Sequence, residues 1–410
     1  MPVLAMRKID SCDVKERTVA LTVKPWPVHE ARADQGAEGR LPELDVVRVL
    51  ALGGVVAVHV LAWAGRDVPP AMRWYIELDL LARLLVPSFI LLTGVVLGQS
   101  AERTRRAPGE FLRKRLLRIA LPWLVWTGVW MTVWEFLAPV LSGREIASPP
   151  ELLEAVASGP GYLYFLLLIL QCSIIFPLFP TGRRARFVVA GAAILLQFGL
   201  SLARLALNDL PDPLHWLLVV HAYEIGAFWV GYFALGVFLG SDAVRLLRPT
   251  RWRVTAAVAV AAVSTGLLMA SSYAEWWNYD RLSGANMYLH PLFLPGASAI
   301  FVLLYWGAGA AIRLVPRLAE WAVTWAAMSF GVYLVHQYPL EIIGPSMQPR
   351  EALLRVSDPL PASLPDLAVL YLVTCAMAAA MVALLRRHPW GLLALGENRE
   401  PRVSDDAVQE

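Results

Sequence analysis

The chain has 410 residues, of which 57% are hydrophobic and only 17% are charged. Its mean hydropathy of +0.54 excludes an ordinary soluble globular protein and indicates a polytopic membrane protein. The formal net charge of +3 indicates no particular partner, and the basic loops lack the aromatic-interleaved pattern of a nucleic-acid-binding surface, so no nucleic-acid partner is expected.

Residues 1–40 are polar and mixed in charge, without a sustained hydrophobic period. They are predicted to form a disordered cytoplasmic tail rather than a signal peptide, because the first apolar run starts only after Asp45. Residues 391–410 are predicted to form a second cytoplasmic tail. Between the two tails, residues 41–390 are expected to make up a single membrane domain.

Ten apolar runs in this domain are long enough to cross about 30 Å of hydrocarbon as helices. The sequence therefore predicts an all-α polytopic membrane protein, a bundle of about ten transmembrane helices. The expected spans are residues 46–65, 79–98, 118–140, 161–180, 186–206, 215–239, 254–273, 290–312, 321–344 and 366–386.

Basic residues are concentrated in alternate loops of this arrangement. Arg and Lys are frequent at 99–118, 181–186, 241–253 and 313–320 and sparse in the intervening loops. The positive-inside rule then predicts that both termini are cytoplasmic. The protein is expected to be a multi-pass protein of the plasma (inner) membrane. Arg83 falls inside the second span near its outer end, where snorkelling to the interface would accommodate it.

The first predicted span carries Arg48 and His59, eleven residues apart in an otherwise almost wholly apolar helix. At 3.6 residues and 5.4 Å per turn, both side chains share one helix face, about 16–17 Å apart along the axis. Ionisable groups inside a membrane helix are costly, so each is a candidate functional residue. A neutral imidazole can take a proton from a hydroxyl, which makes His59 a candidate general base; a structural, hydrogen-bonded histidine is the alternative. Asp45 is expected to brace the Arg48 guanidinium.

A basic run at 113–118 precedes Pro122, near the start of the third span. Arg115 and Arg118 are candidates for binding phosphate groups at the inner face, because guanidinium groups hold phosphate bidentately. The alternative is that the run only sets the topology.

Two further pairs of polar residues lie three positions apart inside predicted spans. Tyr333 and His336 share a face of the ninth span, where a packed tyrosine with a hydrogen-bonded histidine would explain them as well as a site would. His221 and Glu224 form an ionisable pair in the sixth span, and a structural role is favoured for them over a catalytic one.

Several common kinds of site are missing from the sequence. The motifs GxGxxG, GxxxxGK[ST], HExxH and GxSxG do not occur in the context that their chemistry requires. The three cysteines, Cys12, Cys172 and Cys375, lack metal-binding spacing, so neither a metal site nor a disulfide framework is predicted.

Four motifs in the order of the chain resemble those of the membrane-bound acyltransferase-3 family. They are an LDxLRxxA-like opening that leads into Arg-x10-His, a P-x-F-x3-[ST]-G span, an R-x2-R-x3-P loop and a S-[YF]-G-x-Y-L-x-H segment. The serine usual in the second motif is threonine here. The matching residues are Leu44, Asp45, Arg48, Ala51 and His59, then Pro87, Phe89, Thr93 and Gly94, then Arg115, Arg118 and Pro122, then Ser329, Phe330, Gly331, Tyr333, Leu334 and His336.

The resemblance implies an O-acyltransferase that uses acyl-CoA, expected to be acetyl-CoA, from the cytoplasm and needs Arg48 and His59 for activity. The expected acceptor is a hydroxyl of a cell-envelope glycan or lipid-linked saccharide. The spacing of Arg48 and His59 is comparable to an extended pantetheine arm. Arg48, Arg115 and Arg118 would then hold the CoA phosphates while the thioester reaches His59, which acts as general base or carries the acyl group briefly.

Other functions remain open at this stage. Within the enzyme class, the acceptor is alternatively a sugar on a macrolide-type secondary metabolite. Ten spans with intramembrane charges would also suit a transporter or flippase of lipid-linked sugars, although no inverted repeat is visible. A structural membrane subunit would not need Arg48 and His59 on one face.

Overall fold

The computed structural model describes residues 41–64, 73–100, 107–143, 148–158, 160–206, 221–274, 284–343 and 363–397. These residues belong to one compact unit and contain helices but no strand, which confirms the predicted all-α polytopic membrane protein. The predicted tail at 1–40 lies outside the described residues. Residues 391–397 of the second expected tail are described and include part of a short helix.

The α-helices lie mostly within the predicted spans. They are α2 (Pro42–Ala64), α3 (Arg73–Leu85), α4 (Ser88–Gln99), α6 (Pro108–Arg115), α7 (Leu121–Trp130), α8 (Ala138–Ser142), α9 (Pro149–Ser158), α10 (Tyr164–Ile175), α11 (Arg183–Ala206), α13 (Val230–Gly240), α14 (Ala243–Leu246), α15 (Arg251–Ala274), α17 (Phe293–Leu314), α18 (Arg317–Val335), α19 (Gln337–Ile343), α21 (Leu364–Leu385) and α22 (Pro389–Ala394).

Shorter helical segments with different hydrogen-bond periods connect some of them. Two are π-helical, η3 (Leu116–Ala120) and η4 (Met131–Leu137), and four are 3₁₀ turns, η5 (Phe176–Leu178), η7 (Ala222–Glu224), η8 (Gly226–Phe228) and η10 (Gly284–Leu289).

Eight of the helical segments in the described part of the chain are long and apolar enough to cross a membrane. Two of the ten predicted spans are shorter, Tyr164–Leu178 and Val230–Gly240. At 1.5 Å per residue, the eleven residues of α13 reach only about 17 Å, well below the 30 Å of a hydrocarbon core.

The prediction of a regular helix over 215–239 is wrong in the part of that span which is described. Residues 221–229 form the 3₁₀ turns η7 and η8, and the α-helix begins only at Val230. The side chain of Gln171 from α10 replaces the helical ladder there, because its amide donates to Glu224 O at 2.9 Å and accepts from Gly226 N at 2.8 Å. Irregular backbone at membrane depth needs such partners.

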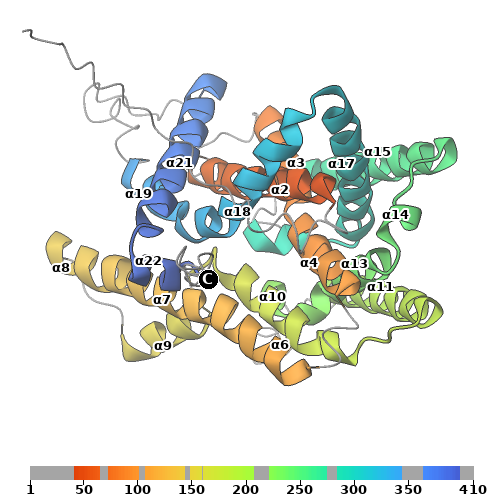
Figure 1. The fold of residues 1–410 in the computed structure, drawn as a ribbon. Helices are drawn as coiled ribbons and strands as arrows, with labels where there is room; N and C mark the ends of the chain where they lie inside the picture. The colour runs from red at the N-terminus through yellow and green to blue at the C-terminus, as the bar shows by residue number, and fades with distance from the viewer. Residues whose placement is uncertain are drawn as a thin grey trace, which may run out of the picture. The chain divides into compact units, whose positions relative to one another are not determined.

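Helix α2 is the central helix of the described unit. It packs against α3, α4, α17, α18 and α21, and Figure 1 shows it in red, enclosed between α18, α3, α17 and α4. The core around it is rich in large apolar side chains, and Trp229, Tyr232, Phe233 and Phe293 are fully buried.

Prolines break or widen three helical segments. Pro87 ends α3 and starts α4, and Pro339 has no N–H to continue the ladder of α18, so that helix gives way at His336. Pro122 likewise lacks an N–H for the helical ladder of the long segment that starts at Pro108. The backbone before it widens into the π-helical turn η3. These interruptions bring His336 to the end of a helix and Arg118 onto a π-turn.

Helices α4 and α13 approach each other through glycine. Gly94 and Gly98 on α4 face Gly236 and Gly240 on α13, each pair in a GxxxG spacing. A Cβ atom on Gly236 would overlap the carbonyl oxygen of Leu91, and one on Gly94 would overlap that of Phe233. Close backbone approach through small residues is a common way to associate helices in membranes.

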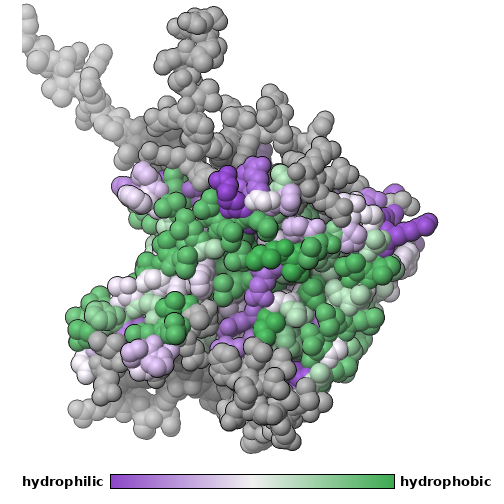
Figure 2. Space-filling model, turned by 90° about the horizontal axis from the view of Figure 1, so that it is seen from below, coloured by the Kyte–Doolittle hydropathy of each residue, from purple (hydrophilic) through white to green (hydrophobic). Residues whose placement is uncertain are grey.

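Apolar side chains cover much of the surface of the described helices. Figure 2 shows hydrophobic residues extending broadly over one face. Exposed large side chains on α11 and α15 include Phe187, Leu195 and Val263. A hydrophobic surface on long apolar helices is what contact with lipid requires.

Candidate active site

The first helix holds three candidate residues in one continuous element. Pro42 occupies its first turn, where the lack of an N–H costs nothing, and Glu43 and Asp45 lie at the positive end of the helix dipole. Because α2 runs unbroken from Pro42 to Ala64, the helical separation expected between Arg48 and His59 applies.

His59 meets His336, a residue 277 positions further along the chain. The centroids of the two imidazole rings lie 5.0 Å apart, with the ring planes inclined at 54°. Tyr162 lies edge-on to both, with centroids 6.3 Å from His59 and 5.6 Å from His336. His59 remains half-buried rather than fully enclosed. Two histidines from α2 and the end of α18 thus share one location.

The hydrogen bonds of His336 determine its tautomer. Its side chain is fully buried, and Nδ1 lies 2.6 Å from the carbonyl oxygen of Tyr333. A carbonyl oxygen only accepts, so Nδ1 carries the proton and Nε2 keeps its lone pair. Among the described residues, Nε2 is buried without a hydrogen-bond partner. The pair therefore contains one imidazole nitrogen that is free to accept a proton or a hydrogen bond.

Two tyrosines hold His336 in place. The Tyr333 hydroxyl donates to the carbonyl oxygen of Tyr162, and the Tyr162 hydroxyl donates to that of Leu334 at 3.3 Å. These reciprocal bonds tie α18 to the turn before α10. Tyr162 is missing from the sequence prediction. The only local signal is the aromatic pair Tyr162 and Tyr164 directly after Pro160 and Gly161, which indicates a turn.

Arg83 does not snorkel to the interface, and that prediction is wrong. Its side chain is 8% exposed, and its Nε donates to Asp79 Oδ2 at 2.6 Å, in an i,i+4 pair on α3. The guanidinium also lies 5.6 Å from the centroid of the Tyr288 ring. Arg83 is close enough to His59 to act on it electrostatically. The i,i+4 spacing of Asp79 and Arg83 in an apolar run was the signal for this pair.

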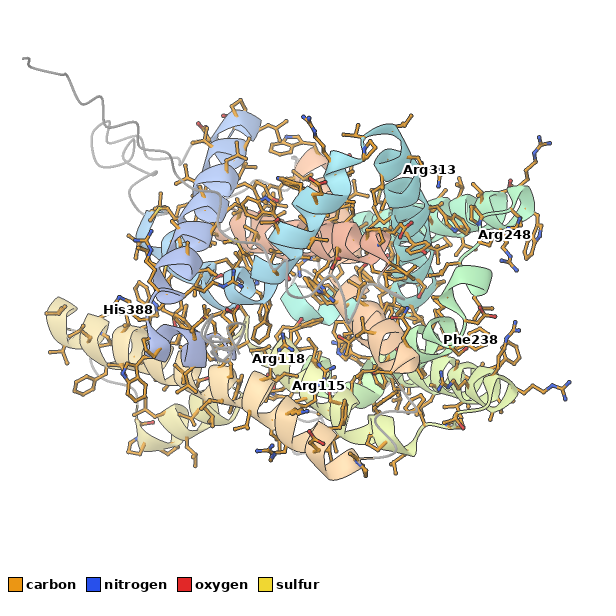
Figure 3. All side chains as sticks on the ribbon, viewed as in Figure 1. Arg115, Arg118, Phe238, Arg248, Arg313 and His388 are labelled. Atoms are coloured by element: carbon orange, nitrogen blue, oxygen red, sulfur yellow. The ribbon has the colours of Figure 1, made fainter. Side chains whose placement is uncertain are left out.

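Three arginines gather toward the other end of α2. Arg48 lies 3.7 Å from Asp45, as the spacing predicted, and keeps 32% of its side chain exposed. Arg115, half-buried, lies over the ring of Phe111 at 5.5 Å and is repelled electrostatically by both Arg118 and Arg48. Figure 3 shows Arg115 and Arg118 near each other on the same helical segment. Guanidinium groups are suited to bind carboxylate or phosphate oxygens through two parallel hydrogen bonds.

The side chains of His221 and Glu224 contact each other, but not within a helix as expected. The Nδ1 and Oε1 atoms lie 3.3 Å apart beside the turn η7. The neighbouring Tyr223 contacts Tyr164 edge-on at 5.0 Å. No contact between this pair and His59 is found among the described residues, so the structure does not bring it to the histidines.

The described residues contain no cluster of three or more His, Cys, Asp or Glu side chains that could hold a metal ion. Cys172 is buried and Cys375 half-buried, and both are free thiols. The described residues bring together two imidazoles and a buried ion pair, and a group of guanidiniums lies toward the other end of α2.

Comparison with known proteins gives one match. A family model described as an acyltransferase domain matches residues 41–387, which is most of the chain and all the residues of the site. Neither the curated proteins nor the solved structures gave a match.

Proposed function

This chain belongs to the acyltransferase-3 family of membrane-bound acyltransferases, and we propose that it moves an acyl group from cytoplasmic acyl-CoA to a hydroxyl group. The observation that carries this proposal is the pair of imidazoles, His59 and His336, in a helical membrane unit whose central helix also carries Arg48, with Arg115 and Arg118 close enough to act on one another electrostatically. Acetyl-CoA is the proposed donor, and a glycan or lipid-linked saccharide of the cell envelope is the proposed acceptor.

The donor would bind with its phosphates at the arginines. Arg48, Arg115 and Arg118 offer planar donors to phosphate oxygens, and the half-exposed state of Arg48 leaves it accessible. Eleven helical residues separate Arg48 from His59 by about 16–17 Å, which an extended pantetheine arm can bridge. The thioester would thus lie beside the histidines while the nucleotide stays at the arginines.

The histidines supply the proton transfers. The acceptor hydroxyl loses its proton to His59 as its oxygen attacks the thioester carbonyl, and the resulting tetrahedral intermediate expels the thiolate of CoA. His59 then returns the proton to that thiolate, so the reaction needs no other proton source. The Nε2 atom of His336, which has no hydrogen-bond partner among the described residues, would accept the N–H of His59 and leave the other nitrogen of His59 as the base.

Substituting His336 should affect turnover more than donor binding. In His336→Ala we expect kcat to fall about 100-fold with the KM for acetyl-CoA unchanged, because a residue that orients a base contributes to the transition state. CoA release from protein reconstituted in lipid measures both constants. His388→Ala is the matched control, since His388 is exposed and lies away from Arg115 and Arg118 in Figure 3. A rise in KM alone would contradict this role.

Substituting Arg48 should weaken the binding of the acyl-CoA donor. Loss of one charge-assisted hydrogen bond, about 1.5–3 kcal/mol, corresponds to a rise of about 10- to 100-fold in the KM for acetyl-CoA in Arg48→Ala, with kcat largely retained. Steady-state CoA release at varied acetyl-CoA gives the measurement. Arg248→Ala, at an exposed arginine of another loop, provides the comparison. An unchanged KM would remove Arg48 from the donor site.

The activity itself is tested with purified protein and labelled acyl-CoA. Transfer of label to an envelope glycan, together with the loss of that acyl group from a deletion strain by mass spectrometry, supports the proposal. Loss of an acyl group from a secreted macrolide-type sugar would identify the alternative acceptor. Protein that never consumes acyl-CoA, whatever the acceptor, would favour a transporter instead.

The proposed orientation has both termini in the cytoplasm of a plasma-membrane protein. It is supported by arginines at the starts of α11, α15 and α18 and at the ends of α17 and α21, which are the same ends on that topology. Accessibility of a C-terminal tag in intact cells and in inverted vesicles tests it.

A further inference from the structure

The Asp79–Arg83 pair lies at the depth of His59. Helices α2 and α3 run antiparallel, and Gly54 contacts Ala82 and Leu85 while the Tyr75 hydroxyl donates to the carbonyl of Leu61. This register places Asp79 opposite His59. An arginine side chain on a helix leans toward the N-terminus, which brings the Arg83 guanidinium to the same level, where it meets Asp79. The pair is thus beside the proposed reacting centre, not at the arginine group near Arg48.

The pair is only half satisfied. Asp79 Oδ2 accepts from Arg83, but Asp79 Oδ1 is buried and accepts from none of the described residues. A buried ion pair is costly to form, and an unpaired carboxylate oxygen adds to that cost. A pair kept only for packing would satisfy both oxygens, as buried polar groups ordinarily are. The open oxygen indicates a hydrogen-bond donor that none of the described residues provides.

We propose that Asp79 and Arg83 form a subsite for a neutral acceptor with neighbouring hydroxyl groups, a carbohydrate, which deepens and rests on the proposed function. Each hydroxyl both donates and accepts. One hydroxyl donates to Asp79 Oδ1, and its neighbour accepts from the guanidinium. An anionic acceptor would be repelled by the Asp79 carboxylate, and a cationic acceptor would be repelled by the Arg83 guanidinium. The pair, which carries no net charge, therefore favours an uncharged polyol.

An aromatic wall completes this subsite. The Tyr288 ring lies 5.6 Å from the Arg83 guanidinium and is held between Trp229, at 5.6 Å, and Phe293, at 5.7 Å between centroids. A rigid aromatic side chain with a polar end suits a ring that has an apolar face and hydroxyl edges. The hydroxyl to be acylated would then lie between this subsite and His59.

The test measures carbohydrate binding without turnover. Full-length protein in lipid nanodiscs is titrated with methyl α-D-mannopyranoside, methyl α-D-glucopyranoside and methyl α-D-galactopyranoside, with propan-1-ol as the single-hydroxyl probe, by saturation-transfer-difference NMR. We expect at least one glycoside, and not propan-1-ol, to bind. Asp79→Asn should weaken that binding about tenfold or more, because it removes the charged acceptor.

A control variant and a double variant separate a specific loss of binding from a loss of folding. Glu110→Gln is the matched control, since Glu110 forms an i,i+4 ion pair with Lys114 at 2.5 Å but is exposed, and it should leave glycoside binding unchanged. If loss of the Asp79 charge beside Arg83 unfolds Asp79→Asn, the double variant Asp79→Asn/Arg83→Gln removes both charges and should likewise lose binding.

The outcomes separate the subsite from the proposed function. Undiminished glycoside binding by a folded variant, or no binding of any glycoside by the wild type, overturns the subsite. Loss of acceptor-free CoA release from acetyl-CoA in Asp79→Asn, with glycoside binding retained, would assign the pair to the donor reaction and also overturn it. A wild type that binds glycosides but never consumes acetyl-CoA would refute the proposed function and support the subsite.

Discussion

Replacing His59 by alanine should lower the rate of acyl transfer about 1,000-fold or more. General acid–base catalysis contributes about 10²- to 10⁴-fold, and His59 is proposed both to take the acceptor proton and to return it to the CoA thiolate. Its ring lies 5.0 Å from that of His336 in the centre of the helical unit. The measurement is CoA release by protein reconstituted in lipid, at saturating acetyl-CoA and acceptor.

Acetyl-CoA binding should survive this substitution, because the phosphates are proposed to bind about 16–17 Å away, beside Arg48. Binding of labelled acetyl-CoA and the thermal unfolding midpoint of His59→Ala therefore serve as controls. Full activity in a correctly folded His59→Ala variant would remove His59 from the mechanism. Acid-quenched wild type that carries label on His59 would identify it as an acyl carrier rather than a general base alone.

Replacing Gly236 by valine should prevent the protein from folding, or destabilise it by about 3 kcal/mol or more. Any Cβ at this position would overlap the carbonyl oxygen of Leu91, and that oxygen belongs to the backbone of α4, so no side-chain rotation relieves the clash. The two helices would have to separate along the contact that includes Gly94 and Gly240. The yield of monodisperse protein and its thermal unfolding midpoint measure the effect.

A matched control is Gly191→Val on α11, a helical glycine whose added Cβ would meet nothing within 4 Å. We expect that variant to express and unfold like the wild type. Wild-type stability of Gly236→Val would show that α4 and α13 do not pack as closely as their glycines indicate. The expected difference in stability between these two variants would come from packing, because both replace a helical glycine by valine.

The GxxxG spacings were readable before the structure, in 94–98 and 236–240, and the structure adds that the two stretches face each other. Arg83 shows the opposite case. Its distance from the end of a predicted span suggested snorkelling, but α3 packs against α2 along this stretch, and the side chain turned to Asp79 inside the unit. A local pattern does not reveal which face of a helix its neighbours cover.

Hydropathy and charge by themselves determined that this is a helical membrane protein and which of its segments are apolar. They also placed Arg48 and His59 on one helix. These features follow from sequence because helix formation and lipid contact depend on local composition and a short repeat. Only the tertiary structure decided that His336 joins His59, that Tyr162 holds it, and that Asp79 and Arg83 lie beside them. The contacts of His59 with Tyr162 and with His336 join residues 103 and 277 positions apart along the chain. They depend on the way α2, α3, α10 and α18 pack together, and the periodicity of a single helix carries no information about that packing.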